Sequence, residues 1–513
     1  MSTRYTIALQ KDLAAQSFKA FFWGTGGSIL RIILQFVTQV ILARLLGPAE
    51  YGIFSLGVIV VGLTAIFYDV GLAYSLIQKK SISTDDIRFV WTWQCILGLS
   101  VATSIFFASG LIADFFSKPE AEFLFQSLSL VILINSLTAL SFNLLKKSLN
   151  YKSIQISQLT SYFLGFACIG IPMAFAGYGH DALAVAWLVQ AAIHFLILYS
   201  NVRHPVSFRL RTHDGNHMLR YSLTALGTNL VNWILNGIDK IWIGKIYSAY
   251  IVGLYTTAYN LVNTPAFTIF VNLQAVFFSA GARLQDDQEA LRTIFLRLLS
   301  LITLTAFPFF IVIGWGSDLI IETVYGIKWA EASQFLVPFA FATPFLLLWG
   351  ISTPVLWNSG HTKLELRLQL PLVFIWVAVL YFITDFSPLT LAIATASLFA
   401  FRSIAMMTAA LYVLKIPISS FLRTIAAGTL LSLLLAVVSA VVKPGIISLD
   451  GIDVSLQLFL LLGVTAVSYL LGLYFLVPKM LDQALRAYLM KEEERLPAWV
   501  RTTSRFLLRY PRP

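Results

Sequence analysis

The sequence predicts an all-α integral membrane protein with about fourteen membrane-crossing helices, and three observations support this fold class. Of the 513 residues, 58% are hydrophobic and only 12% are charged, whereas a soluble domain has about 25% charged residues. The apolar residues form runs of about 20, the length at which a helix crosses a hydrocarbon core about 30 Å thick. Basic residues gather in every second connection between the runs, as in multi-pass membrane proteins.

The predicted crossings follow the apolar runs in chain order. The first group lies at 19–43, 52–76, 89–112, 123–145, 155–177 and 181–201. After a polar connection at 202–218, the second group lies at 219–245, 250–280, 294–315, 331–357, 366–384, 388–413, 421–442 and 455–477. The first run is too long for a cleavable signal peptide, so we expect a retained signal anchor. The tail, 478–513, mixes apolar and charged residues and predicts an amphipathic helix on the inner leaflet.

The charge distribution predicts the orientation. One set of connections, together with both tails, holds most of the 36 Lys and Arg residues. These connections are 79–88, 146–152, 203–220, 283–297, 363–367 and 415–423. The opposite connections hold only Arg44, Lys118, Lys245, Lys328 and Lys443. By the positive-inside rule, both termini and the basic connections are expected to be cytoplasmic.

Several other kinds of site are not expected. Cys95 and Cys168 lie in separate apolar runs, which predicts neither a disulfide nor a thiol–metal site. The glycine-rich stretch 24–27 follows no predicted strand and sits at a membrane interface, so it does not predict a nucleotide site. His194 has no other ligand at metal-binding spacing. We therefore expect no metal or other cofactor and neither a nucleotide nor a nucleic acid partner.

The two groups of crossings contain a weak internal repeat. One shift of the sequence places 44–47 on 245–248 and 52–55 on 253–256, with Gly52 on Gly253. The matched segments then have the same orientation in the membrane. This predicts a parallel repeat, with two halves related by an axis along the membrane normal.

The turn that carries this repeat also carries a family resemblance. The stretch ILARLLGPAEYGIFSLGVIVVGLTAIFYDVGLAYSLIQKK (41–80) and its echo DKIWIGKIYSAYIVGLYTTAYNL (239–261) resemble Wzx-type polysaccharide flippases of bacteria. These belong to the multidrug/oligosaccharidyl-lipid/polysaccharide exporter superfamily. The resemblance implies two six-helix lobes around a central cavity, plus two C-terminal helices. The expected parts are an N-terminal lobe (1–201), a C-terminal lobe (219–413), the added helices (421–477) and the cytoplasmic tail (478–513).

The resemblance also implies a function. Such proteins move an undecaprenyl-diphosphate-linked oligosaccharide, for example an O-antigen unit of lipopolysaccharide, from the cytoplasmic to the outer leaflet by alternating access. The expected location is the bacterial inner membrane, and the expected partners are this lipid-linked glycan, membrane lipids and polysaccharide polymerase or assembly proteins. Two alternatives stay open: a cation-coupled drug antiporter of the same superfamily, and a membrane glycosyltransferase or polymerase. The short outer connections argue against such an enzyme.

The first candidate site residue is Arg31, about 18 Å from either end of the first crossing. A guanidinium at that depth is costly unless it faces a partner or an aqueous cavity. Two interpretations stay open: an ion pair with Asp69 of the next crossing, or a cavity cation that receives the diphosphate of the cargo. Asp69 could also serve ion coupling.

A polar stripe on the seventh crossing supplies more candidates: Asn229, Asn232, Asn236, Asp239 and Lys240. The repeat places Arg31 on Asn232 and Gln35 on Asn236, so both halves have polar groups at matching depth. Adjacent Asp239 and Lys240 are expected to point in different directions, with snorkelling of Lys240 to the outer interface as one outcome. The stripe could contact sugar hydroxyls, or its amides could bond between helices. Asp239 is a second candidate for ion coupling.

The last candidate is Arg402, in the middle of the twelfth crossing. We expect it at the cavity or between the lobes, with snorkelling as the competing outcome. The candidate substrate-binding set is therefore Arg31, Gln35, Asn232, Asn236, Asp239, Lys240 and Arg402.

Overall fold

The computed structural model describes residues 2–68, 72–79, 82–283, 287–382, 387–449 and 451–475. All regular secondary structure in these ranges is helical, which confirms the predicted fold class. The chain divides into two compact units, unit 1 (Met1–Gly253) and unit 2 (Leu254–Pro513). The seventh predicted crossing falls in unit 1, whereas the expected lobes begin a new part at 219. Those lobe boundaries stay a prediction, and the tail at 478–513 lies outside the described residues.

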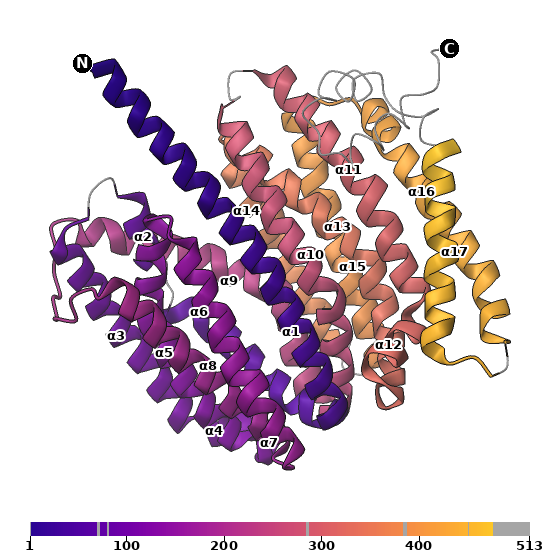
Figure 1. Cartoon of the computed structure of the whole chain (residues 1–513), viewed down its shortest axis with the longest axis horizontal. Helices are drawn as coiled ribbons and strands as arrows, with labels where there is room; N and C mark the ends of the chain where they lie inside the picture. The colour runs from indigo at the N-terminus through magenta and orange to yellow at the C-terminus, as the bar shows by residue number, and fades with distance from the viewer. Residues whose placement is uncertain are drawn as a thin grey trace. The chain divides into compact units, whose positions relative to one another are not determined.

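Unit 1 contains the helices that surround the first candidate site (Figure 1). They are α1 (Ser2–Tyr68), α2 (Leu72–Gln78), α3 (Thr84–Phe107), α4 (Ser109–Phe115), the short 3₁₀ turn η1 (Pro119–Ala121), α5 (Glu122–Lys147), α6 (Tyr151–Tyr162), the π-helical η2 (Phe163–Gly170), α7 (Ile171–Phe175), α8 (Gly179–Val202) and α9 (Gly215–Ile246). The core centres on α5, which packs against both α3 and α8. Its inward side chains Leu124, Phe125 and Val131 are fully buried. This packing fixes α6 and α8 beside α1.

The first two predicted crossings belong to one assigned helix, α1, which is two helices joined at a kink. Gly47 lies at the kink with φ 79° and ψ 177°, a conformation that costs little only for glycine. Pro48 follows, and its fixed φ suits the first turn of the second helix. The GPAEYG stretch therefore forms a tight helix–helix junction. Its Glu50 accepts a 2.8 Å bond from the backbone N–H of His180 and so caps the start of α8.

Unit 2 consists of another set of long helices. Its elements are α10 (Ala249–Arg283, whose first residues belong to unit 1), α11 (Gln288–Trp315), α12 (Ser317–Tyr325), the 3₁₀ turn η3 (Ile327–Ala332), α13 (Ser333–Asn358), α14 (Thr362–Phe382), α15 (Pro388–Val413), α16 (Ile418–Ile447) and α17 (Val454–Phe475). The most buried element is α13, which packs between α11 and α15. The two C-terminal helices, α16 and α17, pack in sequence: α16 packs against α11, and α17 packs against α16.

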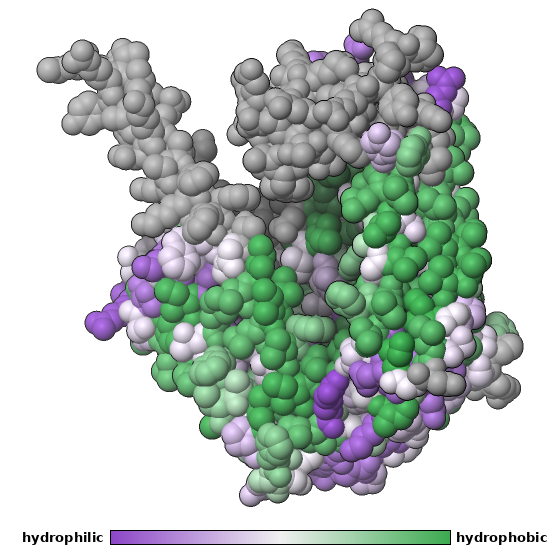
Figure 2. Space-filling view, turned by 45° about the vertical axis from the view of Figure 1, so that its right-hand side comes forward, coloured by the Kyte–Doolittle hydropathy of each residue, from purple (hydrophilic) through white to green (hydrophobic). Residues whose placement is uncertain are grey.

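Most of the long helices have the length and composition of membrane-crossing segments. Within the described residues, 11 segments qualify as candidate spans, and the first, Gly26–Tyr68, contains both of the first two predicted crossings. The helices α9 and α10 match the seventh and eighth predicted crossings in position but are not among the 11, so the count of fourteen stays a prediction. Figure 2 shows largely hydrophobic helix flanks. This surface suits a hydrocarbon environment, and the chain is a multi-pass membrane protein.

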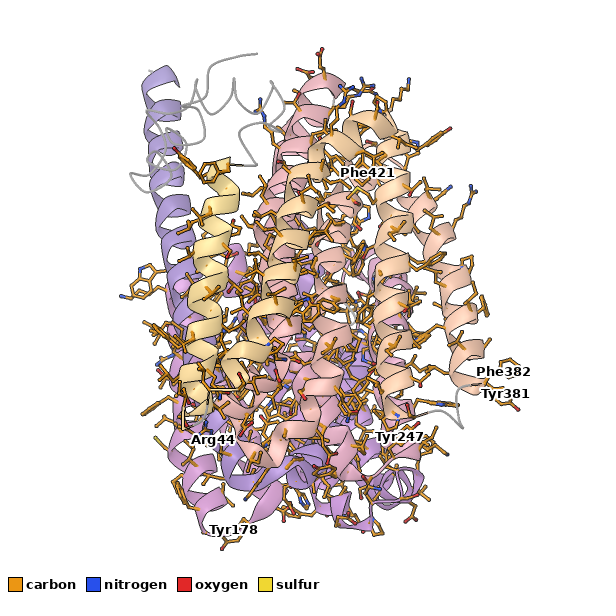
Figure 3. All side chains as sticks on the ribbon, turned by 90° about the vertical axis from the view of Figure 1, so that its right-hand side faces the viewer. Arg44, Tyr178, Tyr247, Tyr381, Phe382 and Phe421 are labelled. Carbon is orange, nitrogen blue, oxygen red and sulfur yellow. The ribbon has the colours of Figure 1, made fainter. Side chains whose placement is uncertain are left out.

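Labelled side chains in each unit agree with the predicted alternation of connections. In unit 1, Arg44, Tyr178 and Tyr247 lie toward the same end of the helices, as three outer connections should (Figure 3). In unit 2, Phe421 lies toward the end of the helices opposite to Tyr381 and Phe382. Tyr and Trp are enriched at membrane–water interfaces, and Tyr381 is 68% exposed at the end of α14.

Candidate functional site

Arg31 of α1 points toward α6 within unit 1. Its Nη1 donates a 2.6 Å hydrogen bond to Oε1 of Gln158, and the side chain is half-buried. Among the described residues, its Nε is buried without a hydrogen-bond partner. Asp69, the predicted ion-pair partner, lies outside the part of the chain that the structure describes. This hydrogen bond is charge-assisted on the arginine side, but the amide of Gln158 carries no charge. It therefore orients the guanidinium without neutralising it.

Polar residues continue along the junction of α1, α6 and α8. Nε2 of Gln155 lies 3.2 Å from Oγ of Ser28 on α1. Oγ of Ser157 lies 2.8 Å from Nδ1 of His194 on α8, which gives that histidine a protein partner, as expected for a packed core residue. This part of α6 therefore has polar groups toward both neighbours. Hydroxyls and amides of this kind can exchange hydrogen bonds with sugar hydroxyls.

Gln35, one turn after Arg31, is half-buried on α1. Its backbone carbonyl lies 3.5 Å from the hydroxyl of Tyr162. A substrate contact by its side chain stays a prediction.

The polar stripe of α9 includes hydrogen bonds within the helix itself. The Nδ2 of Asn236 donates to the carbonyl of Asn232 at 2.7 Å, and Nζ of Lys240 donates to the carbonyl of Asn236 at 2.8 Å. The ammonium also lies 3.3 Å from Oδ1 of Asp239, which is buried. The expectation that these two side chains point apart is therefore wrong, because the long lysine stem folds back beside its neighbour. Lys240 reaches back along α9 rather than toward its outer end, so it does not snorkel outward here.

Arg402 of α15 lies in a buried network of unit 2. Its Nη2 donates a 2.6 Å bond to Oε1 of Gln369, and its guanidinium carbon lies 3.8 Å from the ring centre of Trp349. Nε2 of Gln369 donates in turn to Oε1 of Glu365 at 2.7 Å. Trp357 donates to the other carboxylate oxygen of Glu365 at 2.5 Å. The glutamine thus links a buried cation to a buried carboxylate, and Arg402 is 1% exposed, so it does not snorkel.

Sequence reasoning missed the partners of both arginines. Gln158 lies in α6, far along the chain from Arg31, and nothing local identifies it. Glu365 and Gln369 are one helical turn apart near the start of α14, a spacing that signals a shared face but not its partner. The residues placed together within unit 1 are thus Arg31 with Gln158, and Asn236 with Lys240. Arg402 belongs to the separate network in unit 2.

Unit 2 also has an apolar cavity of about 380 Å³ between α11, α16 and α17. It is lined mainly by Pro308, Phe309, Leu435 and Leu462. The hydroxyl of Tyr469, at its edge, bonds the carbonyl of Leu304 at 3.1 Å. A cavity of this composition suits hydrocarbon rather than a charged or sugar group.

A model of the polysaccharide biosynthesis protein family matches residues 41–334, more than half of the chain. The chain belongs to this family. It is 26% identical to lipopolysaccharide biosynthesis protein WzxC of Escherichia coli (strain K12) over 60% of its own length and 63% of that protein's. The match thus spans less than two thirds of that relative. It is also 24% identical to teichuronic acid biosynthesis protein TuaB of Bacillus subtilis (strain 168), over 67% of this chain and 71% of that protein.

Solved structures show the same fold. The chain is similar to lipid II flippase MurJ in an inward closed conformation, with a TM-score of 0.69, 16% identity, and coverage of 88% of this chain and 97% of that one. An inward-facing MATE family multidrug resistance transporter matches with a TM-score of 0.55, 14% identity, and coverage of 76% and 95%. The resemblance to Wzx-type polysaccharide flippases is confirmed. The chain is thus a membrane protein of the polysaccharide biosynthesis family that has the fold of these transporters.

Proposed function

We propose that this protein moves a lipid-diphosphate-linked oligosaccharide from the cytoplasmic to the outer leaflet of the bacterial inner membrane. The cargo would be an undecaprenyl-linked polysaccharide unit, and both termini would be cytoplasmic. Family membership supports the polysaccharide class of cargo, and likeness to MurJ and MATE transporters supports a transporter fold. The observation that carries the proposal is the Arg31 guanidinium, which lies inside a membrane span and bonds a neutral amide.

Arg31 has the chemistry that a diphosphate requires. A guanidinium forms paired, charge-assisted hydrogen bonds to phosphate oxygens, and Gln158 would hold it in one orientation through a single Nη. The buried Nε, which has no partner among the described residues, would supply another donor. Ser28 and Gln155 nearby would bond glycan hydroxyls, while the isoprenoid chain stays in the hydrocarbon. Alternating access would then expose the same site to the opposite side of the membrane.

A cation-coupled drug antiporter is the competing function, because the chain also shares the MATE fold. An antiporter for cationic drugs needs acidic groups that bind protons, sodium ions or the drug. The two candidate acids are Asp69, which lies outside the described residues, and Asp239, whose carboxylate pairs with Lys240. Arg31 would repel a cationic drug. We therefore favour the anionic cargo.

Substitution of Arg31 tests the proposal. In a host whose surface polysaccharide depends on this gene, we expect Arg31→Ala to reduce surface polysaccharide by about tenfold or more, since a charge-assisted hydrogen bond contributes about 1.5–3 kcal/mol. Arg31→Lys should retain part of the activity because the charge remains without the planar fork. Cargo should accumulate on the inner leaflet.

The matched control is Arg423→Ala, which removes an exposed arginine from the start of α16. It should leave polysaccharide output unchanged. Protein levels by immunoblot and elution as a single species in detergent separate loss of transport from loss of folding. Normal polysaccharide in an Arg31→Ala strain would reject a role for this guanidinium in cargo binding.

A further inference from the structure

The connection between α8 and α9 has an alternating pattern that the transport function does not explain. Residues 203–212, here called the connector, have no regular helix or strand and link the two helices. Three large apolar side chains on alternate residues are strongly exposed: Val206 (51%), Phe208 (73%) and Leu210 (61%). The residues between and after them are Ser207, Arg209 and Arg211. The connector thus exposes three large apolar side chains, with polar and basic residues between them.

Several contacts attach the connector to unit 1, so the positions of its exposed apolar side chains are fixed. His204 is 4% exposed; its Nε2 lies 3.1 Å from Oγ of Ser141, and its ring centre lies 5.0 Å from that of Trp91. The backbone N–H of Arg209 donates to Oγ1 of Thr92 at 2.7 Å. Oγ1 of Thr212 donates to Oδ1 of Asp86 at 3.1 Å.

These contacts set the depth of the connector in the membrane. Thr92 lies about two turns after the start of α3, one of the candidate spans, and Asp86 lies in its first turn. The connector starts where another candidate span, α8, ends at Val202. From His204, beside Trp91, to Thr212, beside Asp86, the connector therefore lies against the first two turns of α3, at the level of lipid headgroups. Apolar side chains exposed at that level favour the headgroup–acyl boundary over water.

The charges near the connector suit an anionic leaflet. Asp85 pairs with Nη1 of Arg209 at 2.8 Å. Asp86 and Asp214 each pair with Nζ of Lys79 at 2.7 Å. The nearby acids are thus compensated within unit 1. Arg203 and Arg211 are exposed and have no ion pair among the described residues, so they leave positive charge facing outward.

We propose that the connector is a membrane-interface anchor that binds the anionic inner leaflet. Val206, Phe208 and Leu210 enter the boundary between headgroups and acyl chains, and Arg203 and Arg211 bind lipid phosphate groups. The anchor lies on the covalent link between the repeat halves and needs no contact with the cargo. We therefore expect the anchor to bind the membrane also when no glycan is present.

Site-directed fluorescence tests this anchor on the full chain. Single cysteines replace residues 206, 207, 208, 210 and 211 in a Cys95→Ala, Cys168→Ser background, are labelled with an environment-sensitive dye, and are reconstituted in phosphatidylcholine vesicles with phosphatidylglycerol. Nitroxide near the top of the acyl chain should quench labels at 206, 208 and 210. Aqueous iodide should quench labels at 207 and 211. His213→Cys is the matched control, because the side chain of His213 is fully exposed, and iodide should quench its label.

Headgroup nitroxides test the choice of lipid. Quenching at residue 210 by labelled phosphatidylglycerol should exceed that by labelled phosphatidylcholine by about fivefold per arginine, the factor for about 1 kcal/mol per basic residue at an anionic surface. Arg203→Gln with Arg211→Gln should abolish this excess, as should high salt. Each variant must elute as a single species and retain polysaccharide output.

Three results would overturn the proposal. Iodide quenching at every position would place the connector in water. Protection of residue 208 from both quenchers would show that a protein covers it. Equal quenching by the two lipids would remove the assignment of Arg203 and Arg211 to lipid phosphate. Since none of these residues contacts Arg31, failure of the anchor would leave the proposed transport function intact.

Discussion

Arg31 and Arg402 are both guanidinium groups inside membrane spans, but their surroundings differ. Arg31 bonds an amide and is half-buried, whereas Arg402 is 1% exposed, stacks on Trp349 and connects through Gln369 to the carboxylate of Glu365. A buried charge that already has a relayed counter-charge has little reason to bind another anion. We therefore propose Arg31, rather than Arg402, as the group that binds the proposed diphosphate, and we expect Arg402 to act in the packing of unit 2.

We expect stability to depend on pH through His204, which attaches the connector to unit 1. Burial lowers the pKa of His204 from its ordinary value of 6.5, although a bond to the carbonyl of Pro205 opposes the shift. Between the folded pKa and 6.5 the unfolded chain binds more protons than the folded one, so stability falls as pH drops below about 6.5. We expect the melting temperature in detergent to fall between pH 7.5 and 5.5, and His204→Phe to reduce that fall.

The control for this prediction is His213→Asn, which removes a fully exposed histidine from the same region. It should show the pH dependence of the unmodified protein. An equal fall in melting temperature for His204→Phe and the unmodified protein would show that His204 does not contribute.

At the scale of residues, the sequence predicts which charges are unusual but not what they contact. Arg31, Asp239 and Arg402 were identified because a charge in an apolar run is costly. Their partners depend on helix packing: Gln158 is one of several amides and hydroxyls on α6, and only the rotation of α6 about its axis brings it to Arg31. The predicted direction of the Lys240 side chain was wrong for a related reason. Sequence spacing fixes the direction of the Cβ atom but not the position of the ammonium at the end of a flexible side chain.

At the scale of elements, the two matched turns of the repeat pack directly on each other. A Cβ on Gly52 would lie 1.8 Å from the carbonyl oxygen of Ala249, and a Cβ on Gly253 would lie 1.9 Å from that of Pro48. The sequence shift that pairs Gly52 with Gly253 also pairs Pro48 with Ala249. The contact is therefore reciprocal, as a two-fold relation between the matched segments requires. Only glycine permits backbones to approach this closely.

Substitution of either glycine should push the two matched turns apart. We expect Gly52→Ala to lower the melting temperature and the yield of folded protein, with a cost of about 3 kcal/mol or more, because backbone atoms cannot move away as a side chain would. Gly253→Ala should behave alike. The double variant should cost less than the sum of the two, since one displacement relieves both clashes.

Gly62→Ala is the matched control in the same half of α1. Its Cβ would meet only Nε1 of Trp233 at 3.5 Å, an ordinary contact. A melting temperature for Gly52→Ala equal to that of Gly62→Ala would refute the close backbone contact between the two turns.

Element positions were predictable to within several residues because apolar runs end at interfaces. The fourth predicted crossing, 123–145, corresponds to α5 (Glu122–Lys147), and the twelfth, 388–413, to α15 (Pro388–Val413). The break between α3 and α4 and the π-helical η2 were not predicted. The third crossing continues from α3 into α4, and the fifth contains the π-helical η2, because local hydrogen bonding adjusts without a change in hydropathy.

At the scale of the whole molecule, composition and charge periodicity were sufficient for the fold class, since a bilayer permits few ways to satisfy backbone hydrogen bonds. The division into units was less accessible. The helix α9 packs on α1 and α2 and is grouped with unit 1, whereas its repeat position is that of a first helix in a second half. The repeat in the sequence therefore does not determine which helices pack together.

The predicted orientation provides the final test. If the basic connections are cytoplasmic, single cysteines at the exposed positions 213 and 361 should resist a membrane-impermeant maleimide in intact cells, and cysteines at 178 and 451 should react. After permeabilisation all four should react, which controls for burial. Each intervening crossing reverses the side, so an even number of crossings must separate 213 from 361, and also 178 from 451. Reaction at 213 from outside, or loss of reaction at 451 with 178 still reactive, would mean that a predicted crossing does not span the membrane.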